Sequence, residues 1–327
     1  MRDHIAHPRW PALDAARGLA LVAMFIFHFC WDLAYFGLTP EGFTDSAQFH
    51  GFGHAIAASF VFIAGLGLTF ASRNGLDWHS AFMRIGLIAL AALGVTAVTY
   101  LIFPDSFIWF GILHLIALGS ALCLPLILAP ALLVAALALI ALILPIILSE
   151  PAFDTPLLQW LGLGTHPPIT NDWRPLLPWF GVMALGLLAG RIIATKGLPR
   201  ALDNWQPKNL LSRSLVWGGR HTLIVYLTHQ PVLFALVFVG STFATPREMD
   251  ISGAQSGFIR GCETQCVATG GEAGLCTRAC GCIAQEATDQ GMSRAVARNQ
   301  LNPEQQVAFN EITKACLRRL TPQAPSP

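Results

Sequence analysis

Long apolar runs fill the sequence up to about residue 240, and they constrain the fold more than any other feature. About 20 apolar residues in a helix, rising about 1.5 Å each, cross the roughly 30 Å hydrocarbon layer of a membrane. The sequence predicts about seven spans, at Gly18–Tyr35, Ala55–Ala71, Arg84–Phe103, Phe107–Leu124, Pro130–Leu148, Trp179–Ala194 and Thr222–Gly240. We therefore predict an all-α fold, a polytopic membrane helix bundle with a small Cys-rich helical C-terminal extension.

The overall composition supports this fold class. The 327 residues are 54% apolar and only 12% charged, whereas soluble domains carry about 25% charged residues. The net charge of +1 argues against nucleic acid as the main partner. The first apolar run ends in Cys30, Trp31 and Asp32, without a small-residue cleavage site. We therefore expect that run to be a membrane helix and not a signal peptide.

Lys and Arg residues favour the cytoplasmic side of a membrane, and here they predict the orientation. They cluster before the first span, between the second and third spans, and around the end of the sixth: Arg2, Arg9, Arg17, Arg73, Arg84, Arg191, Lys196, Arg200, Lys208, Arg213 and Arg220. The alternate connections carry only Arg174. We therefore expect a cytoplasmic N-terminus and, after an odd number of spans, an extracytoplasmic C-terminal tail.

The composition becomes polar after about Ala244, which predicts a membrane domain over residues 1–244 and a tail over residues 245–327. The tail holds six cysteines: Cys262, Cys266, Cys276, Cys280, Cys282 and Cys316. Each C-x3-C pair places two thiols on one helical face, so two helices joined by a Gly-rich turn can form a disulfide-linked hairpin. An oxidising outer compartment agrees with disulfides, and a zinc site is the alternative.

Ionisable residues inside the first apolar run are the first candidates for chemistry. His28 and Asp32 are spaced i,i+4 and share one helical face. Arg17 precedes His28 by about three turns, so it projects from the same stripe. Such groups are costly at membrane depth and mostly face a cavity or a bundle interior. A carboxylate beside an imidazole suits a general base, and a structural polar contact between helices is the alternative.

Other histidines fall near the same predicted membrane level. His50 and His54 share a face if the second helix begins early, and we interpret them as catalytic or acceptor-binding residues, with a polar cap or metal binding as alternatives. His114 is the one ionisable group of the fourth span. It is a substrate-binding candidate, with helix packing as the alternative.

The segment GGRHTLIVYLTHQPV carries the last constellation. Tyr226 and His229 lie on one face of an apolar helix and are predicted to bind substrate. Arg220 and His221 stand at its start, where basic groups and free amides suit a phosphate-bearing ligand. A helix start that obeys the positive-inside rule is the alternative. Asp14 and Arg17, spaced i,i+3, can form an interfacial ion pair.

Five segments carry a resemblance to a known family. In chain order they read DAARGLALVAMFIFHFCWDLAYFG, SFVFIAGLGLTFASR, FGILHLIALG, PLLPWFGVMALGLLAGR and GRHTLIVYLTHQP. Over about residues 10–240 this set resembles the bacterial branch of the heparan-alpha-glucosaminide N-acetyltransferase-like membrane proteins. In the lysosomal enzyme of that family an Asn stands where this chain has His28. Its best-known catalytic His lies in the next connection, where this chain offers His50 and His54.

The resemblance implies a membrane acyltransferase in the inner membrane of a bacterium. It would move an acetyl or other acyl group from cytoplasmic acyl-CoA to a sugar amine or hydroxyl outside. His28, Asp32, His50 and His54 would then be catalytic, Arg17, Arg220 and His221 would bind the CoA phosphates, and His114, Tyr226 and His229 would bind the acceptor. Membrane lipid, acyl-CoA and a glycan or amino-sugar acceptor are the implied partners, with a homo-oligomer open and no metal required. A proton-coupled transporter of a glycan or lipid precursor is the functional alternative.

Overall fold

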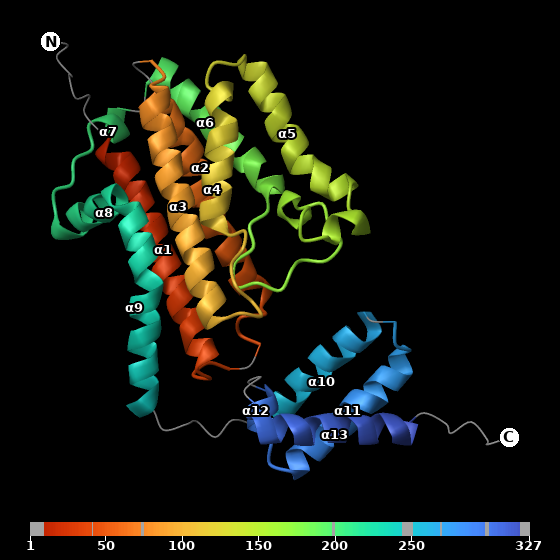
Figure 1. Cartoon of the computed structure of the whole chain (residues 1–327). Coiled ribbons are helices and arrows are strands. Elements are labelled where there is room, and N and C mark those ends of the chain that lie inside the picture. Colours follow the sequence, from red (N-terminus) through yellow and green to blue (C-terminus); the bar gives the residue numbers. More distant parts are fainter. Residues whose placement is uncertain are drawn as a thin grey trace. The chain divides into compact units, whose positions relative to one another are not determined.

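The computed structural model describes residues 10–40, 42–72, 75–197, 200–243, 251–268, 270–297 and 301–320. These residues form helices joined by turns and loops, and none of them lies in a β-strand (Figure 1). Five helices of the described chain are long and apolar enough to cross a membrane: α1 (Pro11–Tyr35), α2 (Ala47–Ala71), α3 (Trp78–Ile102), α6 (Leu176–Lys196) and α9 (Thr222–Phe243). Two shorter apolar helices are α4 (Ile112–Leu126) and α5 (Ala131–Ile147).

These seven helices correspond one by one to the predicted spans, so the predicted fold class is confirmed. The largest difference lies at the second span, which begins at Ala47 and not at the predicted Ala55. The fourth span begins at Ile112, so its predicted start at Phe107 is also wrong. Thr96 and Thr99 of α3 bond the backbone of Ile108, which holds the chain before α4 in a loop. Pro145 lies two residues before the end of α5, whereas α9 continues through Pro231 to Phe243.

Helix α6 packs against α2, α4 and α5 through small residues. A Cβ built on Gly65 of α2 would lie 2.0 Å from the Met183 carbonyl oxygen, and one on Gly186 would lie 2.1 Å from the Phe62 carbonyl oxygen. The Thr69 hydroxyl, also on α2, donates a 3.1 Å hydrogen bond to the Leu187 carbonyl. Small residues let membrane helices approach this closely, since van der Waals contact is what holds them together in lipid.

The connection between α6 and α9 is itself helical, which the sequence reading did not predict. It contains the short α7 (Arg200–Asp203) and α8 (Leu210–Arg220). Asn209 caps α8 because its side chain accepts from the Ser212 amide at 2.8 Å while the Ser212 hydroxyl accepts from the Asn209 amide. Leu211 and Trp217 are exposed on α8 while Val216 is buried.

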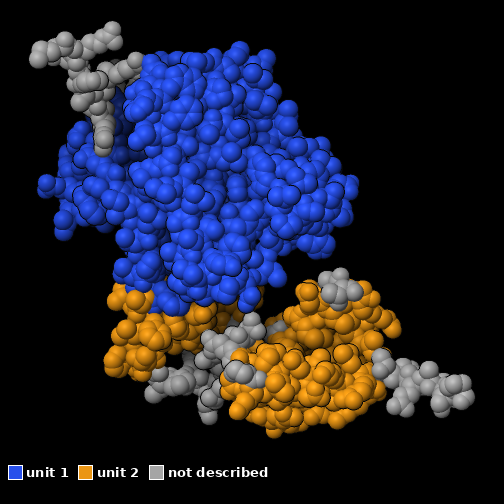
Figure 2. Space-filling model, in the orientation of Figure 1, with its two compact units in different colours: residues 1–29, 50–234 blue, residues 30–49, 235–327 orange. Residues whose placement is uncertain are grey.

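The molecule forms two compact units (Figure 2): residues 1–29 with 50–234, and residues 30–49 with 235–327. Helices α1, α2 and α9 each contribute residues to both units. The first unit holds the main apolar core, in which Val61, Leu115 and Met183 are fully buried.

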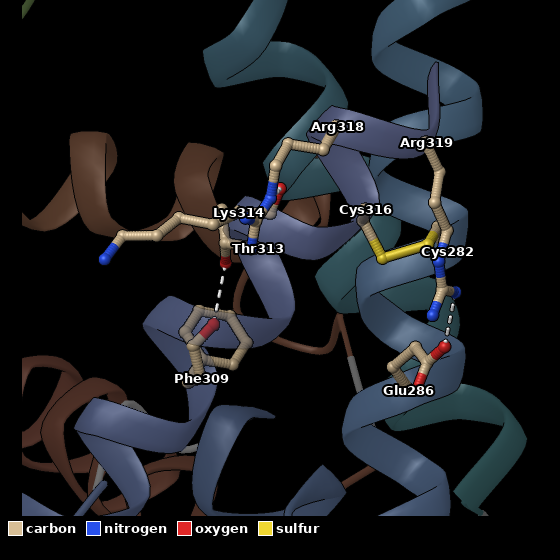
Figure 3. Close-up of a disulfide and its surroundings, with 8 residues drawn as sticks. All are labelled: Cys282, Glu286, Phe309, Thr313, Lys314, Cys316, Arg318 and Arg319. Carbon is tan, nitrogen blue, oxygen red and sulfur yellow. Dashed lines mark hydrogen bonds and ion pairs between the residues drawn. A yellow bond between two sulfur atoms is a disulfide. The ribbon is translucent and has the colours of Figure 1, made fainter. Parts of the chain in front are cut away.

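The tail contains α10 (Ile251–Ala268), α11 (Ala273–Asp289), α12 (Ser293–Ala297) and α13 (Pro303–Leu320). Two disulfides, Cys262–Cys280 and Cys266–Cys276, join α10 to α11 as a hairpin, and Cys282–Cys316 joins α11 to α13. Beside the last disulfide, Arg319 pairs with Glu286 at 2.8 Å (Figure 3). Asn302 caps α13 by accepting from the Gln305 amide at 2.8 Å. All six tail cysteines are thus in disulfides.

Candidate functional site

A carboxylate bound by two arginines lies at the N-terminal end of α1. Asp14 is only 5% exposed. Its Oδ1 lies 3.1 Å from Nη1 of Arg17, and its Oδ2 lies 3.2 Å from Nε of Arg220, at the end of α8. We call these three residues the arginine triad. The structure therefore brings together two of the three residues that the sequence assigns to a phosphate-bearing ligand.

Three glycines make room for the arginine triad. A Cβ on Gly219 would lie 1.7 Å from the Asp14 carbonyl oxygen, and one on Gly18 would lie 2.1 Å from the Leu215 carbonyl oxygen. Helices α1 and α8 therefore touch backbone to backbone. Gly67 of α2 leaves space for the Arg17 guanidinium, whose Nη2 would stand 2.8 Å from an added Cβ.

His221 is the third residue that the sequence assigns to a phosphate-bearing ligand. It is exposed and follows Arg220 of the arginine triad directly in the chain. Its Nδ1 donates to the Trp217 carbonyl at 2.9 Å, and its ring lies 4.8 Å from the Trp217 ring. A groove of about 460 Å³ runs past Arg213, Trp217, Arg220 and His221. Cationic and aromatic side chains therefore line one face of α8 next to the arginine triad.

Two histidines meet in the interior of the bundle. His28 of α1 and His229 of α9 have ring centroids 4.8 Å apart and an interplanar angle of 63°. His28 is half-buried, and His229 is only 4% exposed. Nδ1 of His229 is hydrogen-bonded to the Tyr226 carbonyl oxygen. We call His28 and His229 the histidine pair.

The loop between α5 and α6 brings charge to the histidine pair. Arg174 of this loop is close enough to His28 and to Tyr226 for its charge to act on both, and Asp172 acts on Tyr226. The Arg174 Nε lies 3.7 Å from Oδ1 of Asp172, and its Nη1 donates to the Trp173 carbonyl at 2.9 Å. In the sequence, Arg174 stands out only as the exception to the positive-inside pattern, which is the signal that could have marked it as a candidate.

Asp172 ties this loop to the start of α4. Its Oδ2 accepts a 2.8 Å hydrogen bond from the Ile112 amide, which is a free donor at the N-terminus of α4. Burial raises the pKa of the Asp172 carboxyl, and this effect outweighs the lowering by the Arg174 charge and the Ile112 amide. Asp172 therefore holds the α5–α6 loop against the N-terminus of α4. Burial disfavours the charged form of its carboxyl, while Arg174 and the Ile112 amide favour it.

His50 and His54 lie in the first turns of α2, because this helix begins at Ala47. The condition for their sharing a helical face is therefore met. Nδ1 of His54 donates to the His50 carbonyl at 2.9 Å, and the His54 ring stacks on Trp179 at 5.8 Å and 9°. Arg174 also lies over the Trp179 ring, 5.8 Å from its centroid. Both histidines are exposed.

His114 has internal partners for both ring nitrogens. Nδ1 accepts from the Gly111 amide at 3.2 Å, and Nε2 lies 3.2 Å from the hydroxyl of Thr96, which donates to the Ile108 carbonyl. These bonds give His114 a structural role at the start of α4. Its predicted role in binding substrate stays a prediction.

Asp32 stands one helical turn after His28 on α1. It is fully buried, with 0% of its surface exposed. Burial of a carboxyl side chain at this depth of a predicted span agrees with the reasoning that singled it out. Its catalytic role stays a prediction.

Comparison with known proteins gives one match. The sequence model of the family described as heparan-alpha-glucosaminide N-acetyltransferase, catalytic, matches residues 9–231, which is more than half of the chain. The matched range contains the arginine triad, the histidine pair and the α5–α6 loop. Comparison with curated proteins and with solved structures gives no match.

Proposed function

This chain belongs to the heparan-alpha-glucosaminide N-acetyltransferase catalytic family, a family of membrane acetyltransferases, and from this membership we propose the reaction it catalyses. The protein transfers an acetyl or other acyl group from acyl-CoA to the amine or hydroxyl of a sugar. The single observation that carries the proposal is the histidine pair inside the bundle, because a buried imidazole in contact with a half-buried one needs a functional reason in a membrane.

The donor binds at the arginine triad. Guanidinium groups bind phosphate through paired, charge-assisted hydrogen bonds. Arg17 and Arg220 are held side by side by Asp14, which supports their role as ligands of the CoA phosphates. His221 extends the same basic surface. With the N-terminus in the cytoplasm, acyl-CoA arrives from the cytoplasm of a bacterium.

The acceptor approaches from the opposite membrane side, the periplasm of a bacterium, past His50 and His54. His28 acts as general base: it takes the proton of the acceptor amine or hydroxyl while the nitrogen or oxygen attacks the thioester carbonyl. The carbon–sulfur bond then breaks, and CoA leaves as a thiolate that regains a proton. Asp32, one turn along α1, is the second catalytic candidate on the same helical face. A general base such as His28 contributes about 10² to 10⁴ fold in rate.

Purified protein in detergent tests this reaction. Radiolabelled acetyl-CoA and glucosamine should give labelled N-acetylglucosamine. His28→Ala and Asp32→Asn should each lower the turnover number by at least about 100-fold. Activity unchanged in both variants would remove the proposed base. Transport of a glycan that proceeds without CoA would instead identify a proton-coupled transporter.

The donor site has its own test. Arg17→Gln and Arg220→Gln should each raise the KM for acetyl-CoA about tenfold, the equivalent of about 1.4 kcal/mol. Arg84→Gln serves as the control, since Arg84 is an exposed cation at the start of α3. Unchanged acetyl-CoA binding in both triad variants would show that the phosphates bind elsewhere.

A further inference from the structure

We propose that the histidine pair is a proton relay, in which His28 takes the acceptor proton and passes its own ring proton to Nε2 of His229. This inference rests on the proposed acyl transfer. It gives His229 a role different from the substrate binding that the sequence suggests. His229 acts through His28 and positions it.

The first step is the tautomer of His229. A carbonyl oxygen only accepts, so the hydrogen bond to the Tyr226 carbonyl places the ring proton on Nδ1. A neutral imidazole carries one N–H, and Nε2 is therefore an acceptor with a free lone pair. Nε2 is buried and has no hydrogen-bond partner among the residues that the structure describes. A buried acceptor without a donor is unfavourable, so this atom calls for a donor.

His28 is the group placed to supply that donor. The rings of the histidine pair have centroids 4.8 Å apart. Two imidazoles joined by a hydrogen bond of about 2.9 Å have centroids about 5 Å apart. A rotation of the half-buried His28 ring is therefore enough to aim its N–H at His229. Two other rings contact His229: Phe25 at 5.3 Å has no polar hydrogen to offer, and Tyr226 at 5.5 Å carries a hydroxyl that is the competing donor.

An N–H donated to His229 fixes the other nitrogen of His28 as the free base. Each imidazole then has one defined role, as in other catalytic sites where a second group sets the tautomer of a histidine. Of the remaining charged or titratable groups, Arg174 and Tyr226 face the pair from the α5–α6 loop and from α9, and Asp32 follows on α1 itself. The relay requires none of them to change protonation.

Electrostatics gives the reason for passing the proton on. Burial disfavours a positive charge on either ring, and the charge of Arg174 adds to this effect at His28. When the proton is on His229, the Nδ1–H of that ring donates to the Tyr226 carbonyl, and this hydrogen bond stabilises the imidazolium. The proton thus moves from acceptor to His28 and from His28 to His229. After the carbon–sulfur bond breaks, it returns through His28 to the CoA thiolate, and atoms and charges balance.

Nitrogen NMR tests the hydrogen bond between His28 and Nε2 of His229. The full-length protein is labelled with ¹⁵N-histidine and is measured in lipid nanodiscs without substrate. Signals of the pair are assigned from the variants His28→Gln and His229→Gln. We expect His229 to be protonated at Nδ1 and its Nε2 to show scalar coupling across a hydrogen bond to a nitrogen of His28. A proton on Nε2, or a bond to Nε2 from any other group, would overturn the relay. This result does not depend on activity, so it stands apart from the proposed function.

Single-turnover kinetics in mixtures of H₂O and D₂O test the proton transfer. For the native protein we expect a curved dependence of the rate on deuterium fraction, because two protons move together. His229→Gln should lower the rate at least about tenfold and make the dependence linear, since an amide accepts a hydrogen bond but no proton. A linear dependence in the native protein would overturn the relay, whereas absence of any acetyl transfer would instead overturn the proposed function.

A matched variant controls for the loss of a histidine ring. His79→Phe replaces an exposed histidine at the start of α3 and should leave the rate and the curvature unchanged. His229→Phe removes the acceptor altogether and should be slower than His229→Gln, with the KM for acetyl-CoA unchanged. Equal rates for His229→Phe and the native protein would contradict the proposal.

Discussion

Asp14 shows how single charged residues are used in this bundle. Its carboxylate, almost fully buried, holds the side chains of Arg17 and Arg220 from two helices. Without it, two guanidinium groups would stand close together with no anion between them. The same carboxylate therefore stabilises the fold and holds both cations in place, as the proposed binding of an anionic donor requires.

Replacing Asp14 by Asn should destabilise the protein. Each hydrogen bond to a charged group contributes about 1.5 to 3 kcal/mol when buried, and Arg220 is 44% exposed, so we expect a total loss of about 1 to 3 kcal/mol. Thermal unfolding in detergent measures the loss. Asp203→Asn, at an exposed position, is the control. Equal melting temperatures of Asp14→Asn and native protein would contradict a stabilising triad.

Asp172 should make stability depend on pH. Burial raises its pKa in the folded protein above the unfolded value, so the folded state holds this proton more tightly than the unfolded chain. The stabilisation is then fully present below the unfolded pKa of about 3.9 and is lost as the pH rises through the folded pKa. Melting temperatures of native protein and Asp172→Asn, measured from pH 4 upward, test this. The variant should lack that decrease, and an identical decrease in both would assign it to another group.

Part of the geometry of the candidate site was predictable from the sequence. The burial of Asp32 and the shared face of His50 and His54 follow from helical spacing, which is local. The meeting of His28 with His229 could not be predicted, because they lie on α1 and α9, and no periodicity in either helix says which helices become neighbours. Arg174 is marked in the sequence only as an arginine on the unexpected side.

At the scale of helices, glycine decides which pairs pack tightly. Gly65 and Gly186 bring α2 and α6 together so closely that an added methyl group would meet backbone oxygen. Gly86 and Gly94 of α3, in contrast, have no atom within 4 Å of an added Cβ. Backbone atoms cannot move aside as the end of a side chain can, so only the first two positions require glycine.

Substitution by alanine should be harmful at the two closely packed glycines and harmless at the two glycines of α3. Gly65→Ala and Gly186→Ala force α2 and α6 apart, and we expect a loss of at least about 2 kcal/mol or failure to fold. Gly86→Ala and Gly94→Ala should be neutral or stabilising by up to about 1 kcal/mol, because alanine favours helix. Folded yield and melting temperature in detergent measure both pairs. Similar losses in both pairs would contradict the packing described for α6.

The tail helices depend on disulfides as well as packing. Cys282 and Cys316 are 34 residues apart in sequence, and closing a loop of that length is worth about 3 to 4 kcal/mol in the chain-entropy estimate. The double variant Cys282→Ser with Cys316→Ser should therefore release α13 to protease in the full-length protein. Cys30→Ala, at a free cysteine, is the control. Undiminished protease resistance of the double variant would show that packing alone holds α13.

The helices themselves were largely predictable. Hydropathy located the seven apolar helices of the described chain, and the C-x3-C spacing predicted the hairpin of α10 and α11. Helix α8 was missed because its eleven residues are too few and too polar for a span. The Asn209–Ser212 capping pair was the available signal, and it is visible only when short helices are sought.

At the scale of the whole molecule, the two ends of the bundle have opposite tasks in the proposed reaction. The arginine triad lies at the end where α1 begins and α6 finishes, and Asp172 and His54 lie at the end where α4, α2 and α6 begin. His28 and His229 occupy the interior of the same unit. An enzyme arranged in this way can use a donor and an acceptor that never share a compartment.

Transfer across a sealed membrane tests that claim most directly. The protein is reconstituted in one orientation in vesicles, with labelled acetyl-CoA on the side of the α1 N-terminus and glucosamine on the other. We predict labelled N-acetylglucosamine on the glucosamine side, and none with His28→Ala. Acetylation that occurs only when both substrates are on one side, or that persists in His28→Ala, would contradict the account.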